Sequence, residues 1–216
     1  MKMLIFDLDG TLLNTLGDIG GACNAILKKY GFPEHEIPAY KKMVGNGFTK
    51  LVERALPAEA VSLMSRSTFE ALVDEAKQQY AEHMMDATLP YPDMQKVLAE
   101  LKSMGKSLAV LSNKPDNLSN SLVKFFFPDI IFAFIRGALP DIPLKPDPEA
   151  LYCLVAPYNL ALSDTIYIGD SDVDMQFAHN AKVIAGGACW GFRGKEELKK
   201  SGANILLENP ENLLKL

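Results

Sequence analysis

The run M-K-M-L-I-F-D-L-D-G-T-L-L-N-T, residues 1–15, decides the fold of this chain. Residues 3–6 within it are a short apolar run of the kind that a buried parallel strand requires. Two carboxylates, Asp7 and Asp9, and then Gly10-Thr11 follow that run directly. Because open α/β sheets bind their ligands beyond the carboxyl ends of their strands, the run predicts a functional site at this point.

Further along the chain, compact apolar segments alternate with segments in which apolar residues recur at helical spacing. Alternation of this kind is typical of right-handed crossovers between parallel strands. The sequence therefore predicts an α/β fold with a Rossmann-like, mostly parallel sheet. Its expected strands after the first are 108–111, 130–135, 165–168, 182–185 and 204–207, and its expected helices are 94–104, 116–126, 150–158 and 173–181.

Residues 16–86 show helical spacing and no strand pattern. We expect a first helix with Asp18 as its N-cap and Gly31 as its stop, a second over 48–56, and two more between 58 and 85. The chain thus divides into an α/β core, residues 1–14 and 88–216, and an inserted all-helical cap domain, residues 15–87.

The composition excludes several classes of protein. A formal net charge of −5 argues against a nucleic-acid partner, which would require a basic surface. The same charge repels anionic substrates unless local positive charge or a metal offsets it, so we expect a bound divalent cation for any phosphate chemistry here. Three widely spaced cysteines without a C-x-x-C pair suggest reduced thiols, and no apolar stretch approaches the ~20 residues that span a bilayer. We therefore expect a cytoplasmic protein without a membrane partner.

Polar groups also end two later strands of the predicted core, Ser112-Asn113 and Asp170, and Lys145 lies in the proline-rich loop 140–148. In a parallel sheet these strand ends lie on one edge and can converge. The set suits phosphoryl transfer: one carboxylate attacks phosphorus, and a second protonates the leaving oxygen. A hard cation, a hydroxyl and a lysine would hold the phosphoryl oxygens.

Four motifs in this order resemble those of the haloacid dehalogenase superfamily, in its phosphatase branch. They are D-L-D-G-T (7–11), L-S-N-K (111–114), K-P-D-P (145–148) and G-D-S-D-V-D (169–174). The resemblance implies that Asp7 is the nucleophile and Asp9 the acid/base. It also implies a bound Mg²⁺.

The other expected site residues follow from the same resemblance. Phosphate would be bound by Thr11, Ser112, Asn113 and Lys145. The metal would be bound by the Asp7 carboxylate, the Asp9 carbonyl and Asp170. Asp174 lies one helical turn beyond Asp170, so both can face the metal, and Asp174 would act through water.

Within the cap, the segment 40–57 is similar to the corresponding segment of phosphoglycolate phosphatases, and Lys42, Asn46 and Arg54 are its candidate substrate residues. The resemblance implies a phosphoric monoester hydrolase for a small phosphorylated metabolite, with 2-phosphoglycolate as the leading candidate.

Several alternatives stay open at this point. A β-phosphoglucomutase-like phosphoryl transferase shares the core and both aspartates, and pyrophosphatases and nucleotidases occur in the same cap class. A non-catalytic binding or scaffold protein is the alternative from a different class, although a scaffold has no physical need for Asp9 or Lys145. The sequence leaves the oligomeric state open between a monomer and a homodimer.

Overall fold

The computed structural model describes residues 1–155 and 162–216, which form two compact units. The α/β unit comprises Met1–Asn14 and Pro90–Leu216, and the helical unit comprises Thr15–Leu89. The second crossing of the chain between the units therefore falls just beyond the expected boundary at residues 87 and 88. Among the described residues, no helix is both long enough and apolar enough to cross a membrane.

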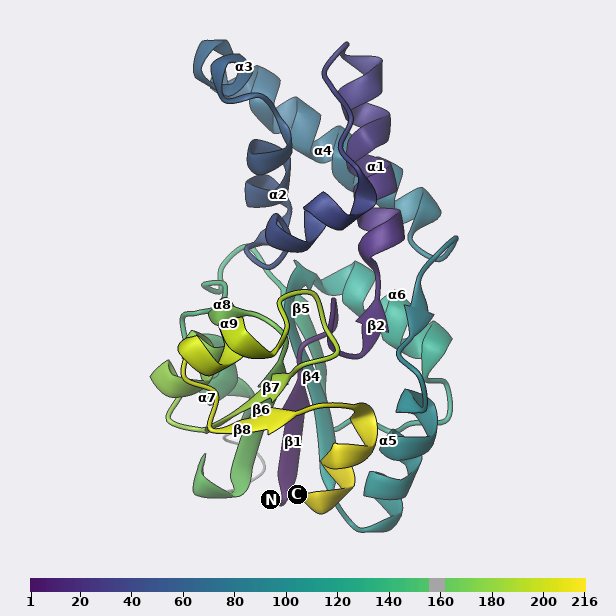
Figure 1. The fold of residues 1–216 in the computed structure, drawn as a ribbon, viewed down its shortest axis with the longest axis vertical. Helices are drawn as coiled ribbons and strands as arrows, with labels where there is room; N and C mark the ends of the chain where they lie inside the picture. The colour runs from purple at the N-terminus through teal and green to yellow at the C-terminus, as the bar shows by residue number, and fades with distance from the viewer. Residues whose placement is uncertain (156–161) are drawn as a thin grey trace. The chain divides into compact units, whose positions relative to one another are not determined.

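A six-stranded sheet in the order β5-β4-β1-β6-β7-β8 forms the centre of the α/β unit (Figure 1). Every pair of neighbouring strands in it is parallel, which confirms the expected fold class. Strands β2 and β3 form a separate two-stranded sheet. The strands are β1 (Met3–Phe6), β2 (Leu13–Asn14), β3 (Leu89–Pro90), β4 (Ser107–Pro115), β5 (Ile135–Ala138), β6 (Thr165–Gly169), β7 (Ile184–Ala188) and β8 (Ile205–Leu207).

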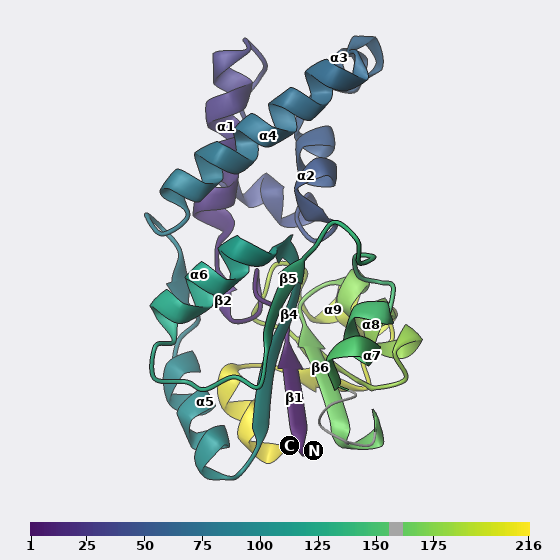
Figure 2. The same cartoon turned by 180° about the vertical axis from the view of Figure 1, so that it is seen from behind.

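Helices cover both faces of the sheet. Figures 1 and 2 show α5 and α6 on one side, and α7, α8 and α9 on the other. On the second side Met3 and Ile5 of β1 pack with Phe177 of α8 and Leu198 of α9, all fully buried. The helices are α5 (Met94–Ser103), α6 (Asp116–Phe126), α7 (Glu149–Val155), α8 (Asp172–Asn180) and α9 (Lys195–Lys200), with short 3₁₀ turns η3 (Leu162–Asp164) and η4 (Pro210–Lys215).

Some element boundaries differ from the sequence prediction. The strand expected at 130–135 begins only at Ile135, because residues 127–130 form a turn and the Ile131 side chain is exposed rather than buried. The strand expected at 182–185 is β7, which starts at Ile184; Lys182 has a φ of 57°, which no strand residue adopts. The end of the helix expected at 150–158 lies outside the described residues.

The helical unit contains four α-helices and one 3₁₀ turn, in agreement with the predicted pattern. They are α1 (Leu16–Lys29), η1 (Ile37–Lys42), α2 (Gly47–Ala55), α3 (Ala58–Leu63) and α4 (Arg66–His83). Helix α1 packs along α4, and an apolar core of side chains from α1, α2 and α4 lies inside the unit.

Asp18 is not the N-cap of α1, contrary to the sequence prediction. Thr15 occupies that position and makes no side-chain cap bond, while Asp18 lies within the first turn. The buried Asp18 carboxylate instead accepts hydrogen bonds from the backbone N–H groups of Ala87 and Thr88, both at 2.8 Å, and from the Thr88 hydroxyl at 2.7 Å. It therefore joins the first turn of the helical unit to the last residues of the same unit.

Candidate active site

The strand order brings the predicted polar groups of the core to one edge of the sheet. Strand β1 lies between β4 and β6, so Asp7, at the end of β1, has Ser112 of β4 on one side and Asp170, at the end of β6, on the other. Carboxylate oxygens of Asp7, Asp170 and Asp174 all lie within 4.8 Å of one another, and all three residues are buried. Residues from distant parts of the sequence thus form a single acidic cluster.

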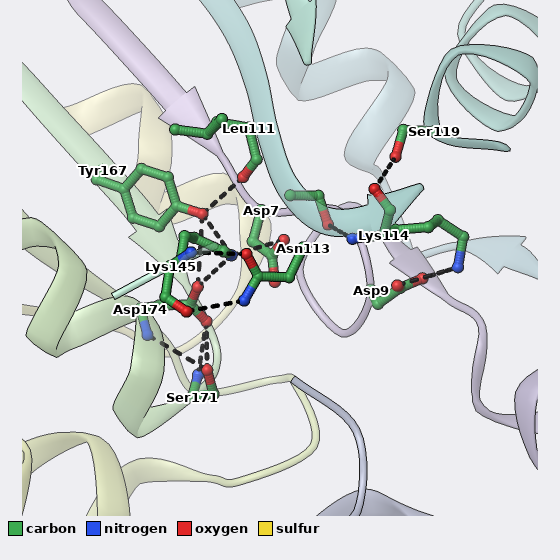
Figure 3. A network of polar contacts seen from close by, with 11 residues as sticks. Asp7, Asp9, Leu111, Asn113, Lys114, Ser119, Lys145, Tyr167, Ser171 and Asp174 are labelled. Carbon is green, nitrogen blue, oxygen red and sulfur yellow. Dashed lines mark hydrogen bonds and ion pairs between the residues drawn. The ribbon is translucent and has the colours of Figure 1, made fainter. Parts of the chain in front are cut away.

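Lys145 lies at the centre of this cluster (Figure 3). Its Nζ is 2.7 Å from Asp174 Oδ1, 3.0 Å from Asp7 Oδ1 and 2.7 Å from the Tyr167 hydroxyl. The Lys145 side chain is only 4% exposed. A buried lysine requires partners of this kind, because an unpaired buried charge is strongly unfavourable.

Asn113 fixes the backbone of Lys145. Its side-chain Nδ2 donates to the Lys145 carbonyl at 3.0 Å, and its Oδ1 accepts from the Lys145 N–H at 2.8 Å. The sequence analysis predicted that Asn113 binds phosphate. The structure places its side-chain amide against the peptide groups of Lys145, where it positions that lysine.

Asp174 is held by Ser171 at the start of α8. The Asp174 Oδ2 accepts from the Ser171 N–H at 3.0 Å, and the Ser171 hydroxyl oxygen accepts from the Asp174 N–H at 3.4 Å, so the two residues form a capping box. The Ser171 hydroxyl also donates to Asp174 Oδ2 at 2.6 Å. Since Oδ1 accepts from Lys145, both carboxylate oxygens of Asp174 have protein partners. This arrangement makes Asp174 a residue that orients Lys145.

Burial sets the electrostatics of the cluster. Burial raises the pKa of Asp7 to about 6. The negative charges of Asp174 and Asp9 also raise this pKa, and the positive charge of Lys145 lowers it. Burial, together with Asp174 and Asp7, raises the pKa of Asp170 well above its ordinary value. Burial alone would lower the pKa of Lys145, but the attraction of Asp174 and Asp7 outweighs it and the pKa is raised. The cluster holds more acids than Lys145 can neutralise.

The residues present fit a divalent cation. Hard cations prefer carboxylate and carbonyl oxygens, and this cluster offers buried carboxylates whose negative charge is costly without a further positive group. Because both oxygens of Asp174 have protein partners, Asp7 and Asp170 are the direct carboxylate candidates. One Asp170 oxygen also accepts from the Phe192 N–H at 2.6 Å.

Two glycines allow Asp170 to approach the first motif. Gly10 has a φ of 84°, and a Cβ there would lie 2.4 Å from Asp170 Oδ2. A Cβ at Gly191 would lie 2.2 Å from Asp170 Cβ and 2.4 Å from the Gly10 carbonyl oxygen. Trp190, beside Gly191, donates from its indole nitrogen to the Thr11 carbonyl at 3.0 Å. The segment after β7 therefore packs directly on the first motif.

The remaining predicted core residues follow β1 or lie within β4. Ser112 is buried, and the Thr11 side-chain hydroxyl is fully buried with no hydrogen-bond partner among the described residues. Asp9 faces away from the Lys145 cluster and pairs with Lys114, whose Nζ lies 2.9 and 3.0 Å from its two carboxylate oxygens (Figure 3). The buried, unpaired hydroxyl of Thr11 is a group that an additional ligand could satisfy.

Of the three substrate candidates of the helical unit, Lys42 ends η1, Asn46 is the N-cap of α2, and Arg54 lies in the last turn of α2. The Arg54 guanidinium donates to the Met43 carbonyl and to Asn46 Oδ1, both at 2.8 Å, so the structure brings Arg54 and Asn46 together. Lys42 is exposed at the end of η1.

Three residues of the network were not predicted from the sequence. Ser171 had a recognisable signal, because Ser-x-x-Asp before a helix is typical of a capping box. Lys114 is the last residue of the second motif, L-S-N-K, but the sequence does not indicate its partner. Tyr167 lies in an apolar strand, and its hydroxyl, which donates to the Leu111 carbonyl at 2.7 Å, gives no sequence signal.

A Rossmann-like sheet whose central strand ends in two aspartates, with a buried lysine at the same edge, defines a class of α/β enzymes that use carboxylate chemistry. The sequence pattern of the haloacid dehalogenase-like hydrolases matches residues 4–187, and the chain belongs to this family. It is accordingly an enzyme of the hydrolase type, as the sequence analysis predicted.

Curated relatives are similar over nearly their whole length. A phosphoglycolate phosphatase of Mannheimia succiniciproducens is 30% identical over 100% of this chain and 97% of its own. One of Caulobacter vibrioides is 32% identical over 95% of this chain and 86% of its own. A crystal structure from Lactobacillus delbrueckii subsp. bulgaricus, provisionally assigned as a phosphoglycolate phosphatase, superposes with a TM-score of 0.90 at 30% identity and covers 98% of this chain and 96% of that one.

Proposed function

We propose that this chain is a magnesium-dependent phosphatase that hydrolyses small phosphate monoesters through an aspartyl-phosphate, with 2-phosphoglycolate as the leading substrate. The pairing of Lys145 with Asp7, beside Asp170, carries the proposal. A carboxylate next to a buried cation can receive a phosphoryl group, because the cation offsets the charge that both bring. The relatives named phosphoglycolate phosphatase support the choice of substrate.

In the first half-reaction, a carboxylate oxygen of Asp7 attacks phosphorus and the bond from phosphorus to the ester oxygen breaks. Asp9 donates its proton to that leaving oxygen, which departs as the alcohol. In the second, a water molecule attacks the phosphorus of the aspartyl-phosphate. Asp9 takes a proton from this water, the bond between Asp7 and phosphorus breaks, and inorganic phosphate leaves.

The surrounding residues bind and orient the phosphoryl group. Lys145, Ser112 and the unpaired hydroxyl of Thr11 supply donors, and the Asn113 amide holds Lys145 in place. Asp7, Asp170 and the Asp9 carbonyl would hold Mg²⁺, and Asp174 would act on it through water. When bound, Mg²⁺ supplies positive charge that reduces the repulsion between carboxylate and phosphate.

The helical unit supplies the substrate selectivity in this proposal. A small phosphorylated acid has a carboxylate that Lys42 or Arg54 can bind, and Arg54 is already oriented by its bonds to Asn46 and Met43. Arg54→Lys should then raise the KM for 2-phosphoglycolate more than the KM for a phosphate monoester whose alcohol part carries no charge.

We place the enzyme in the cytoplasm, acting on a small metabolite without a nucleic-acid or membrane partner, as a monomer or homodimer. The cysteines Cys23, Cys153 and Cys189, all free thiols, support a reducing compartment.

The test is phosphate release from a panel of small phosphate esters, including 2-phosphoglycolate, with Mg²⁺ and with chelator. Wild type is compared with Asp7→Asn, which preserves the size of the side chain but removes the nucleophile. Release that requires metal and disappears in the variant supports the proposal. Absence of release from every ester contradicts it, and transfer of the phosphoryl group back to a sugar phosphate would point to a mutase instead.

A further inference from the structure

Each of the two aspartates of the first motif has its own buried lysine. Asp7 pairs with Lys145, and Asp9 pairs with Lys114 (Figure 3). The Lys114 side chain is 1% exposed and that of Asp9 is 12% exposed, so this is a largely desolvated ion pair. The Lys114 Nζ contacts both carboxylate oxygens of Asp9, at 2.9 and 3.0 Å, and these two contacts limit rotation of the carboxylate.

The backbone around Lys114 is fixed on several sides. The Ser119 hydroxyl donates to the Lys114 carbonyl at 3.2 Å. The pairing of β4 with β5 shifts register between Leu111 and Pro115, so the strand is irregular at this lysine. On the neighbouring strand, a Cβ at Gly137 would lie 2.5 Å from the Lys114 carbonyl oxygen, so that only a glycine fits the approach of β5.

We propose that Lys114 is a positioning residue for Asp9: it holds the Asp9 carboxylate where this side chain can serve the leaving oxygen and the hydrolytic water. The proposal rests on the acid/base role given to Asp9 under the proposed function. It adds a residue that acts through Asp9, whose two carboxylate oxygens its ammonium group contacts.

The pair has a specific kinetic consequence. An alkyl phosphate has a basic leaving oxygen that must be protonated as it departs, whereas p-nitrophenolate departs without a proton. A misplaced Asp9 therefore slows the first half-reaction of alkyl phosphates and leaves that of p-nitrophenyl phosphate nearly unchanged. A lysine that only stabilised the fold would affect both substrates alike.

The experiment compares wild type, Lys114→Met, Lys114→Arg and Asp9→Asn in single-turnover and burst kinetics. For Lys114→Met we expect the first step with 2-phosphoglycolate to slow by about 10- to 100-fold, with a change in KM below about 3-fold. With p-nitrophenyl phosphate the same variant should give a burst of p-nitrophenolate at nearly the wild-type rate, followed by slow turnover. Lys114→Arg, which keeps the charge, should recover part of the loss.

A double-mutant cycle identifies the partner through which Lys114 acts. Adding Lys114→Met to Asp9→Asn should cause little further loss of rate, because Asp9 is already disabled. Lys195→Met, which removes an exposed lysine paired with Glu208, is the control for the loss of one positive charge and should keep the wild-type rate. Far-ultraviolet circular dichroism of each variant checks that it is folded.

The outcomes separate the two proposals. Two results in an active enzyme would show that Lys114 is structural and that the positioning role is wrong. In one, Lys114→Met slows the first half-reaction of both substrates equally. In the other, the loss of rate caused by Lys114→Met adds fully to the loss caused by Asp9→Asn. If wild type hydrolyses no ester, the proposed function is wrong and the role of Lys114 fails with it.

Discussion

The Nζ of Lys145 lies 3.0 Å from Oδ1 of Asp7, and both side chains are almost completely buried. Lys145 also contacts Asp174, so one cation serves two carboxylates. A buried charge pair of this kind contributes little net stability compared with apolar packing, but removal of one partner leaves an uncompensated buried charge. The pair is therefore better explained by chemistry than by stability.

Replacement of Lys145 by methionine is the most direct test of this relationship. We expect Lys145→Met to lower kcat by about 10²- to 10³-fold, because the phosphoryl oxygens lose a preorganised donor. The free energy of unfolding should also fall, by about 3–5 kcal/mol, because Asp7 and Asp174 lose their cation. Steady-state kinetics and urea unfolding measure the two effects; unchanged kcat in a folded variant would remove Lys145 from the site.

Asp170→Asn tests the proposed metal site. This change keeps the size of the side chain and weakens a candidate metal ligand, so the Mg²⁺ concentration for half-maximal rate should rise by at least about 100-fold. A matched control is Asp172→Asn, because Asp172 is an exposed aspartate in the first turn of α8, two residues from Asp170. Equal Mg²⁺ requirements in both variants would argue against a role for Asp170 in metal binding.

The pH dependence of stability in chelator tests the electrostatics of Asp7. Burial raises its pKa to about 6, above the value near 4 of an exposed aspartate. Between these values the folded state binds more protons than the unfolded state, so stability falls as pH rises from about 4 to about 6. Thermal unfolding of wild type and Asp7→Asn at pH 4.5 and 7.5 measures the difference.

Relative to wild type, Asp7→Asn should therefore gain about 2 kcal/mol of stability between pH 4.5 and pH 7.5. Addition of Mg²⁺ at pH 7.5 should raise the melting temperature of wild type more than that of the variant. Parallel pH profiles for the two proteins would show that Asp7 titrates normally.

Asp18→Ala tests the hydrogen bonds within the helical unit. The change leaves the N–H groups of Ala87 and Thr88 without their acceptor and should cost about 2–4 kcal/mol. Amide hydrogen exchange should accelerate at these two residues first. Asp74→Ala, which removes an exposed partner of Lys77, should change stability by less than about 0.5 kcal/mol. Equal effects of the two changes would contradict the importance of Asp18.

The centre of the sheet was predictable because β1, β4 and β6 each contain a continuous apolar run. The edge strand β5, I-R-G-A, lacks such a run, and its position was predicted wrongly. The meeting of Asp7, Asp170 and Lys145 was also predictable, since parallel strands place their carboxyl ends on one edge. Both inferences need only the order of elements along the chain. Neither requires the direction of an individual side chain.

The remaining site features depend on tertiary contacts that leave no local pattern. Asp18 has the sequence context of an N-cap, yet its partners lie at the other end of the helical unit. The family resemblance predicts that Asn113 binds phosphate, but no local pattern indicates that its side chain also bonds to the backbone of Lys145. In the same way, only the folded strand shows that Lys114 reaches Asp9.

The bonds from Asp18 to Ala87 and Thr88 have a consequence for modular exchange. They keep the entrance and exit of the helical unit beside each other, and β2 pairs with β3 at the same two crossings. An inserted segment whose two ends lie side by side can be lengthened, shortened or replaced by that of a relative. The distance between its two attachment points in the α/β unit then stays the same. Under the proposed function, recombination at residues 15 and 89 would therefore let the choice of substrate diversify independently of the chemistry at the sheet edge.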